Sequence, residues 1–260
     1  MKRSLTAALL GVGLLASRNP VSARGASDLS MRVLVNGAAL PEYASRGRLY
    51  VEAAKGREFT IRLSNPTAGR VAVALSVDGR NVIDAHRTND RDATKWVLDP
   101  GQTIDIPGWQ ISGETSRRFF FTETSQSYAK WLGDTANVGT IEAVFFRERV
   151  RPAAIAPKDE RGASSNAAPA APMRQSAAEP RARDAESYAA TGIGERTAFP
   201  VERVSFDADP TPAARVAIRY EFHPELVRLG VLPRPDDGLA SRERARGFEN
   251  AYAPDPDGPR

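Results

Sequence analysis

The segment from residue 62 to residue 110 constrains the fold more than any other, because strand patterns and tight-turn residues alternate along it. Just before it, residues 57–63 place Phe59, Ile61 and Leu63 on one face of an extended chain and polar side chains on the other. A period of two is typical of a half-buried strand. Residues 71–77 are apolar or small on both faces, which predicts a central strand covered on both sides.

Two turns divide this segment. Asp78 and Gly79 form a dipeptide that favours a two-residue hairpin. Pro100 and Gly101 follow Asp99 in a pattern typical of a type II turn, in which the glycine takes a positive φ. Short strands joined by such turns predict antiparallel pairing.

Similar patterns elsewhere predict more strands, at residues 31–35, 38–40, 49–52, 117–122, 140–147, 201–207 and 214–221. Residues 127–132 lack strand alternation and residues 223–229 end at Gly230, so each predicts a short helix. The predicted fold is all-β: an antiparallel β-sandwich, immunoglobulin-like or jelly-roll-like, with one or two short helices. Residues 31–148 form the sandwich domain, and residues 191–232 contribute two strands and a helix that complete it.

The first 23 residues have the pattern of a secretory signal peptide. Lys2 and Arg3 precede twelve uncharged, mainly apolar residues, and small residues up to Ala23 follow as a cleavage site. A short membrane anchor is the alternative, but spanning a bilayer takes about 20 apolar residues. We therefore expect a periplasmic or secreted bacterial protein that does not span the membrane.

Removal of this leader changes how the net charge is interpreted. The formal net charge is +4, and the leader contains three basic residues and no acidic one, so cleavage lowers the charge to +1. A strongly basic chain would suggest nucleic acid as a partner. With most of the surplus in the leader, we expect no nucleic-acid binding.

Residues 149–190 differ in composition from the segments on both sides. Fourteen alanines and five prolines occupy these forty-two positions. Such a segment buries too little apolar surface to offset the entropy of ordering, which predicts a disordered linker. An alanine-rich helix is the alternative, although Pro169, Pro172 and Pro180 would interrupt it. Residues 233–260 are rich in Pro, Asp, Arg and Gly, which predicts a disordered tail.

Several motifs together resemble an uncharacterised family of bacterial β-rich proteins. They are LPEY at residues 40–43, GRLYVEA at 47–53, SVDGRNVIDA at 76–85, PGQTIDIPGW at 100–109 and TGIGE at 191–195. The resemblance implies no activity, substrate or cofactor. More loosely, the turn patterns look like those of immunoglobulin-like sandwiches, which host many unrelated functions.

Most catalytic and cofactor patterns are missing from the sequence. The chain has no cysteine and only two histidines, His86 and His223, neither with the spacing of a zinc site, so we expect no metal and no cofactor. No G-x-S-x-G elbow occurs. The glycines Gly192 and Gly194 lack the third glycine of a phosphate-binding loop and indicate a flexible return to the sheet.

Two groups of side chains remain as candidate binding residues. Asp78, Asn81 and Asp84, with further acidic and amide residues at positions 89–92, could supply oxygen ligands to a hard cation, or they could satisfy their own backbone in turns. Trp109, Trp131 and Tyr128 could stack on sugar rings or anchor a protein partner, or they could pack in the core.

Three functions fit this pattern. The first is an exported, non-enzymatic binding or structural module of the cell envelope or extracellular space, with an envelope glycan or a protein as its partner. The second is an exported hydrolase that uses two carboxylates, for which Glu114, Glu123 and Glu142 are available. The third is a cation-dependent adhesive domain.

Overall fold

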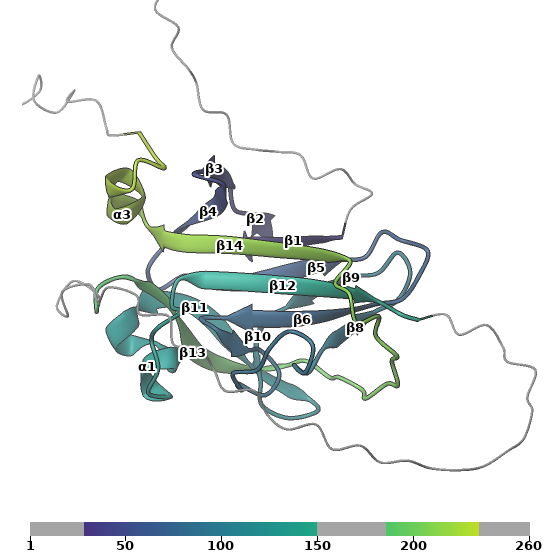
Figure 1. Cartoon of the computed structure of the whole chain (residues 1–260). Coiled ribbons are helices and arrows are strands. Elements are labelled where there is room, and N and C mark those ends of the chain that lie inside the picture. Colours follow the sequence, from purple (N-terminus) through teal and green to yellow (C-terminus); the bar gives the residue numbers. More distant parts are fainter. Residues whose placement is uncertain (1–28, 150–185, 234–260) are drawn as a thin grey trace, which may run out of the picture.

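Two β-sheets packed face to face make up the described part of the chain, residues 29–149 and 186–233 of the computed structural model (Figure 1). Each sheet contains seven strands, and the strand pairs are antiparallel except for one parallel pair, β4 with β14. The all-β sandwich predicted from the sequence is therefore confirmed.

The first sheet has the order β10-β11-β5-β1-β2, with β13 paired to β11 and β9 paired to β5. Its strands are β1 (Ser30–Val35), β2 (Ala38–Ala39), β5 (Glu58–Ser64), β9 (Thr103–Ile106), β10 (Gly108–Gln110), β11 (Thr115–Glu123) and β13 (Ala189–Ala198).

The second sheet has the order β3-β4-β14-β12-β6-β7, with β8 paired to β6. Its strands are β3 (Tyr43–Ser45), β4 (Arg48–Ala53), β6 (Val71–Val77), β7 (Arg80–Asn81), β8 (Trp96–Leu98), β12 (Thr140–Arg147) and β14 (Ala214–Phe222). The strand β14 follows the undescribed segment in sequence, yet it lies between β4 and β12 (Figure 1).

Short helices lie at the ends of strands. A 3₁₀ turn, η1 (Thr124–Gln126), leads into α1 (Tyr128–Trp131), and the hydroxyl of Ser127 accepts a hydrogen bond from the Lys130 backbone N–H at 3.0 Å, which caps α1. The helix α3 (His223–Arg228) continues directly from β14, and Gly230 follows it with φ +68°. Both predicted helices are confirmed.

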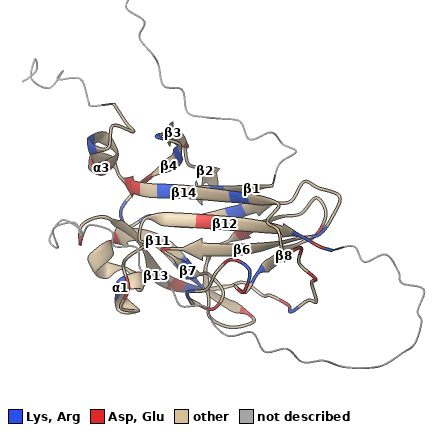
Figure 2. Ribbon diagram, in the orientation of Figure 1, with Lys and Arg blue, Asp and Glu red and all other residues tan. Residues whose placement is uncertain are grey.

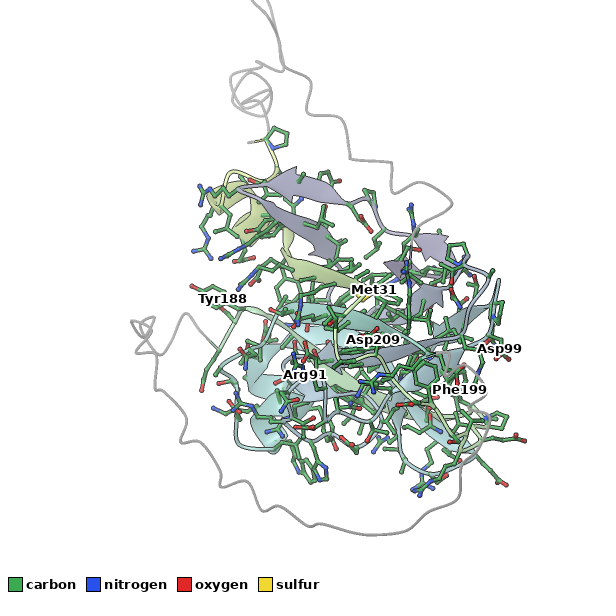
Figure 3. All side chains as sticks on the ribbon, turned by 45° about the vertical axis from the view of Figure 1, so that its right-hand side comes forward. Met31, Arg91, Asp99, Tyr188, Phe199 and Asp209 are labelled. Atoms are coloured by element: carbon green, nitrogen blue, oxygen red, sulfur yellow. The ribbon has the colours of Figure 1, made fainter. Side chains whose placement is uncertain are left out.

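The main core fills the space between the sheets. Alternate residues of β5, β6 and β12 point inward and are fully buried, and Met31 of β1 lies among them (Figure 3). Phe59 stacks on Phe119 and Phe121 with ring centroids 5.2 Å and 4.3 Å apart. Of the three consecutive phenylalanines, Phe119 and Phe121 are therefore core residues, whereas Phe120 points to the other face and covers Gly192.

The local predictions for the hairpin segment are confirmed. Asp78 and Gly79 both have positive φ, 51° and 74°, between β6 and β7. Gly101 has φ +71°, and the Gln102 N–H donates to the Asp99 carbonyl at 3.1 Å, which closes the second turn. Both faces of β6 are mostly buried, as expected of a central strand.

The strand predicted at residues 201–207 is wrong. This segment forms no ladder; a single bridge joins Ala208 to Glu148, and Val204 is 55 % exposed. The late strand of the first sheet is instead β13, which begins at Ala189, within the last two positions of the predicted linker. Since β13 occupies the free edge of β11 from Glu123 to Thr115, residues 201–207 find no equivalent edge there.

Other expectations fall on undescribed residues. The leader at 1–23, most of the predicted linker at 149–190 and almost all of the tail at 233–260 lie outside the described residues. Within the described ranges, no helix has the length and apolar character needed to cross a bilayer.

Candidate functional site

Asp78, a candidate from the sequence, lies at the centre of a buried polar cluster. Its carboxylate accepts hydrogen bonds from the Tyr220 hydroxyl at 2.6 Å, the Gly139 N–H at 2.9 Å and the Thr191 N–H at 2.8 Å. The Tyr220 hydroxyl also lies 2.7 Å from the Thr191 hydroxyl. The cluster joins the β6–β7 turn to β13 and β14, and thus joins one sheet to the other.

Burial dominates the electrostatics of this cluster. It raises the pKa of Asp78 to about 6, although hydrogen bonds from Tyr220 and from backbone N–H groups oppose the shift. Burial and the nearby Asp78 carboxylate raise the pKa of Tyr220 well above its usual value. With its oxygens already bonded to protein donors and the residue buried, Asp78 acts as a structural hub.

Asn81 and Asp84 are also bonded within the protein. The Asn81 amide donates to the Thr94 carbonyl at 2.7 Å, and its oxygen accepts from the Ile83 N–H at 2.8 Å. Asp84 accepts from the His86 N–H at 2.9 Å and from the Thr94 hydroxyl at 2.5 Å. These contacts fix the loop after β7, as expected of turn chemistry. Across residues 29–149 and 186–233, no three His, Asp or Glu side chains are grouped as a metal site would require.

The three aromatic candidates occupy different environments. Trp109 is 2 % exposed, and its indole N–H donates to the Gly192 carbonyl at 3.2 Å, so it belongs to the core. Tyr128 packs between Trp109 and Trp131, with ring centroids 4.9 Å and 5.7 Å away. Trp131 is 77 % exposed and stacks on Tyr128 at an interplanar angle of 13°. Only Trp131 offers an open ring for recognition.

The acidic residues considered for hydrolysis are on separate elements. Glu123 ends β11 in the first sheet and forms an ion pair with Lys55 at 2.6 Å. Glu142 lies on β12 in the second sheet and pairs with Arg215, while Glu114 is exposed in the β10–β11 turn. His223 contacts Glu52 at 3.2 Å at the start of α3.

The outer face of the second sheet carries two hollows, and the larger one is lined in part by Asn81, Asn89 and Asp90, which the sequence analysis named as possible oxygen ligands. The larger, about 400 Å³, lies over β6 and β12 and beside the loop at residues 84–95. Polar side chains make up most of its lining, among them Ser76, His86, Thr88, Asn89, Asn137 and Thr140. The smaller, about 310 Å³, lies over β4 and β14 beside the end of α3.

Strand β14 joins these two hollows. Its outward residues alternate as Arg215, Ala217 and Arg219; Arg215 lines the larger hollow and Arg219 the smaller one. Thr140, in the larger hollow, is the cross-strand partner of Arg219. Ala217 is exposed between them, so a short side chain separates the hollows.

The larger hollow has both acidic and basic residues in its lining, whereas arginines outnumber the one acidic residue in the smaller hollow; Figure 2 shows the charged residues along the strands. Arg215 contacts both Glu142 and Asp90, and these hydrogen bonds raise its pKa. Arg46, Arg48 and Arg219 line the smaller hollow with Tyr50, Glu221 and Leu229. Burial raises the pKa of Glu221 to about 7, which weakens its negative charge near neutral pH.

Part of this face could be predicted from the sequence. The alternation along residues 214–221 already places Arg215, Ala217 and Arg219 on one face of a strand. The approach of Arg46 and Arg48 depends on the parallel pairing of β4 with β14, two strands that lie far apart in the sequence.

A scan against protein-family models, a search of curated proteins and a search of solved structures each found no match to this chain. The fold and the site themselves define the class, a two-sheet β-sandwich with a polar, hollowed outer sheet face.

Proposed function

We propose that this protein is an exported, non-enzymatic binding module of the bacterial envelope or extracellular space, which holds its ligand on the outer face of the second sheet. The leader pattern at residues 1–23 supports export. One observation above all supports binding: two hollows of about 400 and 310 Å³ lie side by side on that face.

The chemistry of the face fits binding better than catalysis. Its lining is mainly hydroxyl, amide and guanidinium groups, which recognise polar ligands by hydrogen bonds. The carboxylates of Glu142 and Asp90 are held by Arg215. Two carboxyls have a pKa raised toward neutrality, and both are bonded within the protein: Asp78 is buried and accepts from Tyr220, and Glu221 accepts a hydrogen bond from the Ala189 N–H at 3.2 Å.

The test compares the protein with a variant whose outer face is blocked. Ala217→Trp places a large ring between the two hollows, and Ala38→Trp adds the same ring to an exposed alanine of β2 in the first sheet. Soluble polysaccharides, peptidoglycan fragments and a panel of peptides serve as probes in affinity electrophoresis and titration calorimetry.

We expect Ala217→Trp to weaken binding of the retained probe at least tenfold and Ala38→Trp to leave it unchanged. Equal binding by both variants would place the ligand elsewhere, and no retention of any probe would oppose the proposal. Release of new reducing ends from a polysaccharide would favour the hydrolase instead.

A further inference from the structure

The smaller hollow gathers three arginines from two strands and a turn. Arg46 lies in the β3–β4 turn, Arg48 begins β4 and Arg219 lies on β14. The register pairs Arg219 with Tyr50, and Arg48 is two residues before Tyr50 on the same face of β4. Leu229, just after α3, forms the apolar lip of the hollow.

Carboxylates balance only part of the positive charge of these arginines: Arg219 interacts electrostatically with Glu221 but forms no ion pair with it. Across residues 29–149 and 186–233, Arg46, Arg48 and Arg219 form no ion pair. Arg215, which lies on the same face of β14 as Arg219, forms two. The one acidic residue in the lining is Glu221, which is half-buried and accepts a hydrogen bond from the Ala189 N–H at 3.2 Å. The hollow therefore has a surplus of positive charge.

The turn that presents Arg46 has an unusual residue for its shape. Arg46 and Gly47 both have left-handed φ, 52° and 71°, as a type I′ hairpin turn requires. The first position of such a turn favours Asn, Asp or Gly, and a long side chain there is uncommon. Among the described residues, Asn36, Asp78 and Ala85 also have positive φ, and Arg46 is the one of these four with a cationic side chain.

We propose that this hollow binds the carboxylate groups of an acidic polysaccharide whose chain continues over Ala217 into the larger hollow. The inference rests on the proposed function and names its ligand class. Guanidinium forks match carboxylates in bidentate geometry. The hydroxyl and amide groups of the larger hollow match sugar hydroxyls, and Arg215 and Arg219 are about 13 Å apart along the strand.

Other polyanions fit this face less well. An acidic protein partner would need apolar anchors, and Leu229 is the only large exposed apolar side chain of the described residues that lines either hollow. A single-stranded nucleic acid would need exposed aromatic rings for base stacking, and the one aromatic of the smaller hollow, Tyr50, is 6 % exposed.

The first test measures binding of the full chain to polygalacturonate by titration calorimetry, with dextran as the neutral polysaccharide and poly-glutamate as the acidic peptide. Arg48→Gln and Arg219→Gln should each weaken binding of polygalacturonate by roughly tenfold, since a charge-assisted hydrogen bond is worth that factor. Arg32→Gln, an exposed arginine of β1 in the first sheet, is the matched control and should change nothing. Thermal melting of each variant confirms folding.

Glu221 provides a second test. As the pH falls from 8 to 6, Glu221 takes up a proton and stops repelling the ligand carboxylates, so binding should strengthen and Glu221→Gln should lose that pH dependence. The charged groups around Glu221 are Arg219 on its own strand, its register partner Glu52 on β4, Glu225 and Arg228 on α3, and Arg46 and Arg48 in the same hollow. His223 contacts Glu52. The protein with Glu221 and the Glu221→Gln variant are therefore both measured in a His223→Gln background, so that they differ only at residue 221.

The outcomes separate this inference from the proposed function. Equal affinity for dextran, or tighter binding of poly-glutamate than of polygalacturonate, would overturn the ligand class while the binding module stands. Unchanged affinity in Arg48→Gln and Arg219→Gln would also overturn it. If Ala217→Trp alone then loses binding, the proposed function still stands. If the unmodified protein binds none of the probes, both proposals are overturned.

Discussion

The buried cluster around Asp78 leads to a sharp prediction for the substitution Tyr220→Phe. The hydroxyl that this substitution removes donates to the Asp78 carboxylate at 2.6 Å and lies 2.7 Å from the Thr191 hydroxyl. All three residues are buried, so water cannot easily replace the lost partner. The ring itself stays, so its packing against Phe59 and Phe121 is preserved.

The magnitude follows from the charge of the acceptor. With a pKa of about 6, Asp78 is mainly ionised at pH 7.5, and a hydrogen bond to a charged group is worth about 1.5–3 kcal/mol. The buried Thr191 hydroxyl also loses a neighbour, so the expected loss is about 2–4 kcal/mol of the free energy of unfolding. In a domain of this size each kcal/mol lowers the melting temperature by about 2–4 °C, which gives a decrease of roughly 5–15 °C.

Chemical denaturation and thermal melting at pH 7.5 measure this loss, and Tyr50→Phe is the matched control. Tyr50 is also buried on a strand of the same sheet, but its hydroxyl has no hydrogen-bond partner among the described residues. We expect Tyr50→Phe to change the free energy of unfolding by less than about 0.5 kcal/mol. A loss of similar size in both variants would refute the assignment of Asp78 and Tyr220 as the hub that joins the sheets.

Four further outcomes follow from the structure. Because folding raises the pKa of Asp78 from an ordinary 3.8 to about 6, the folded state holds a proton that the unfolded state releases between these values. The contribution of Asp78 to the free energy of unfolding should therefore fall by about 2–3 kcal/mol as the pH rises from about 4 to about 6. Urea denaturation across this range should show a weaker dependence of the free energy of unfolding on pH for Asp78→Asn. Trp109→Ala should cost about 3–5 kcal/mol in the same assay, whereas Trp131→Ala should cost under about 0.5 kcal/mol. Gly108→Ala should destabilise by about 3 kcal/mol or more, because a Cβ there would lie 1.8 Å from the Arg117 carbonyl oxygen, and Gly113→Ala, with open space around it, should be nearly neutral. Calcium or a chelator should leave the melting temperature unchanged, and an increase with calcium would revive the adhesive-domain hypothesis.

Elements whose pattern is local could be predicted from the sequence. Each of the strands β5, β6, β12 and β14 shows a period of two in the size or polarity of its side chains. The turn at Asp78 and Gly79 is predicted from that dipeptide alone. The short helix α1 was predicted because residues 127–132 lack strand alternation, and the structure shows that Ser127 caps it. Each of these signals depends on residues within one strand or one turn, so no knowledge of distant contacts was needed.

Strand β13 shows where local patterns fail. Its first residues are small, and its glycines weaken any strand signal. These glycines are explained only by a neighbouring strand: a Cβ at Gly192 would lie 2.2 Å from the Phe120 ring on β11. The alternation at residues 201–207 indicated a strand instead, but a strand needs a free edge, and β13 takes the one on β11.

The candidate site depended even more on contacts between distant residues. Asp78 has the sequence signature of a turn residue, and only the fold shows that it accepts hydrogen bonds from residues 61, 113 and 142 positions away. These hydrogen bonds show that Asp78, in the acidic turn that suggested a cation site, holds distant parts of the fold together. A carboxylate with three protein donors is satisfied without a metal ion.

The same long-range contacts determine where the arginines lie. Tyr220, which bonds to Asp78, and Arg219, which lines the smaller hollow, are adjacent on β14 and point to opposite faces of the sheet. The inward tyrosine is anchored by the buried cluster, so the register of β14 against β4 and β12 is held by a contact inside the sandwich. A one-residue slip of β14 would bury Arg219 and expose Tyr220. Loss of the Asp78–Tyr220 bond should therefore disturb the arginine cluster on the outer face even though no side chain of the cluster contacts Asp78, which connects the stability of the core to the binding proposed for the surface.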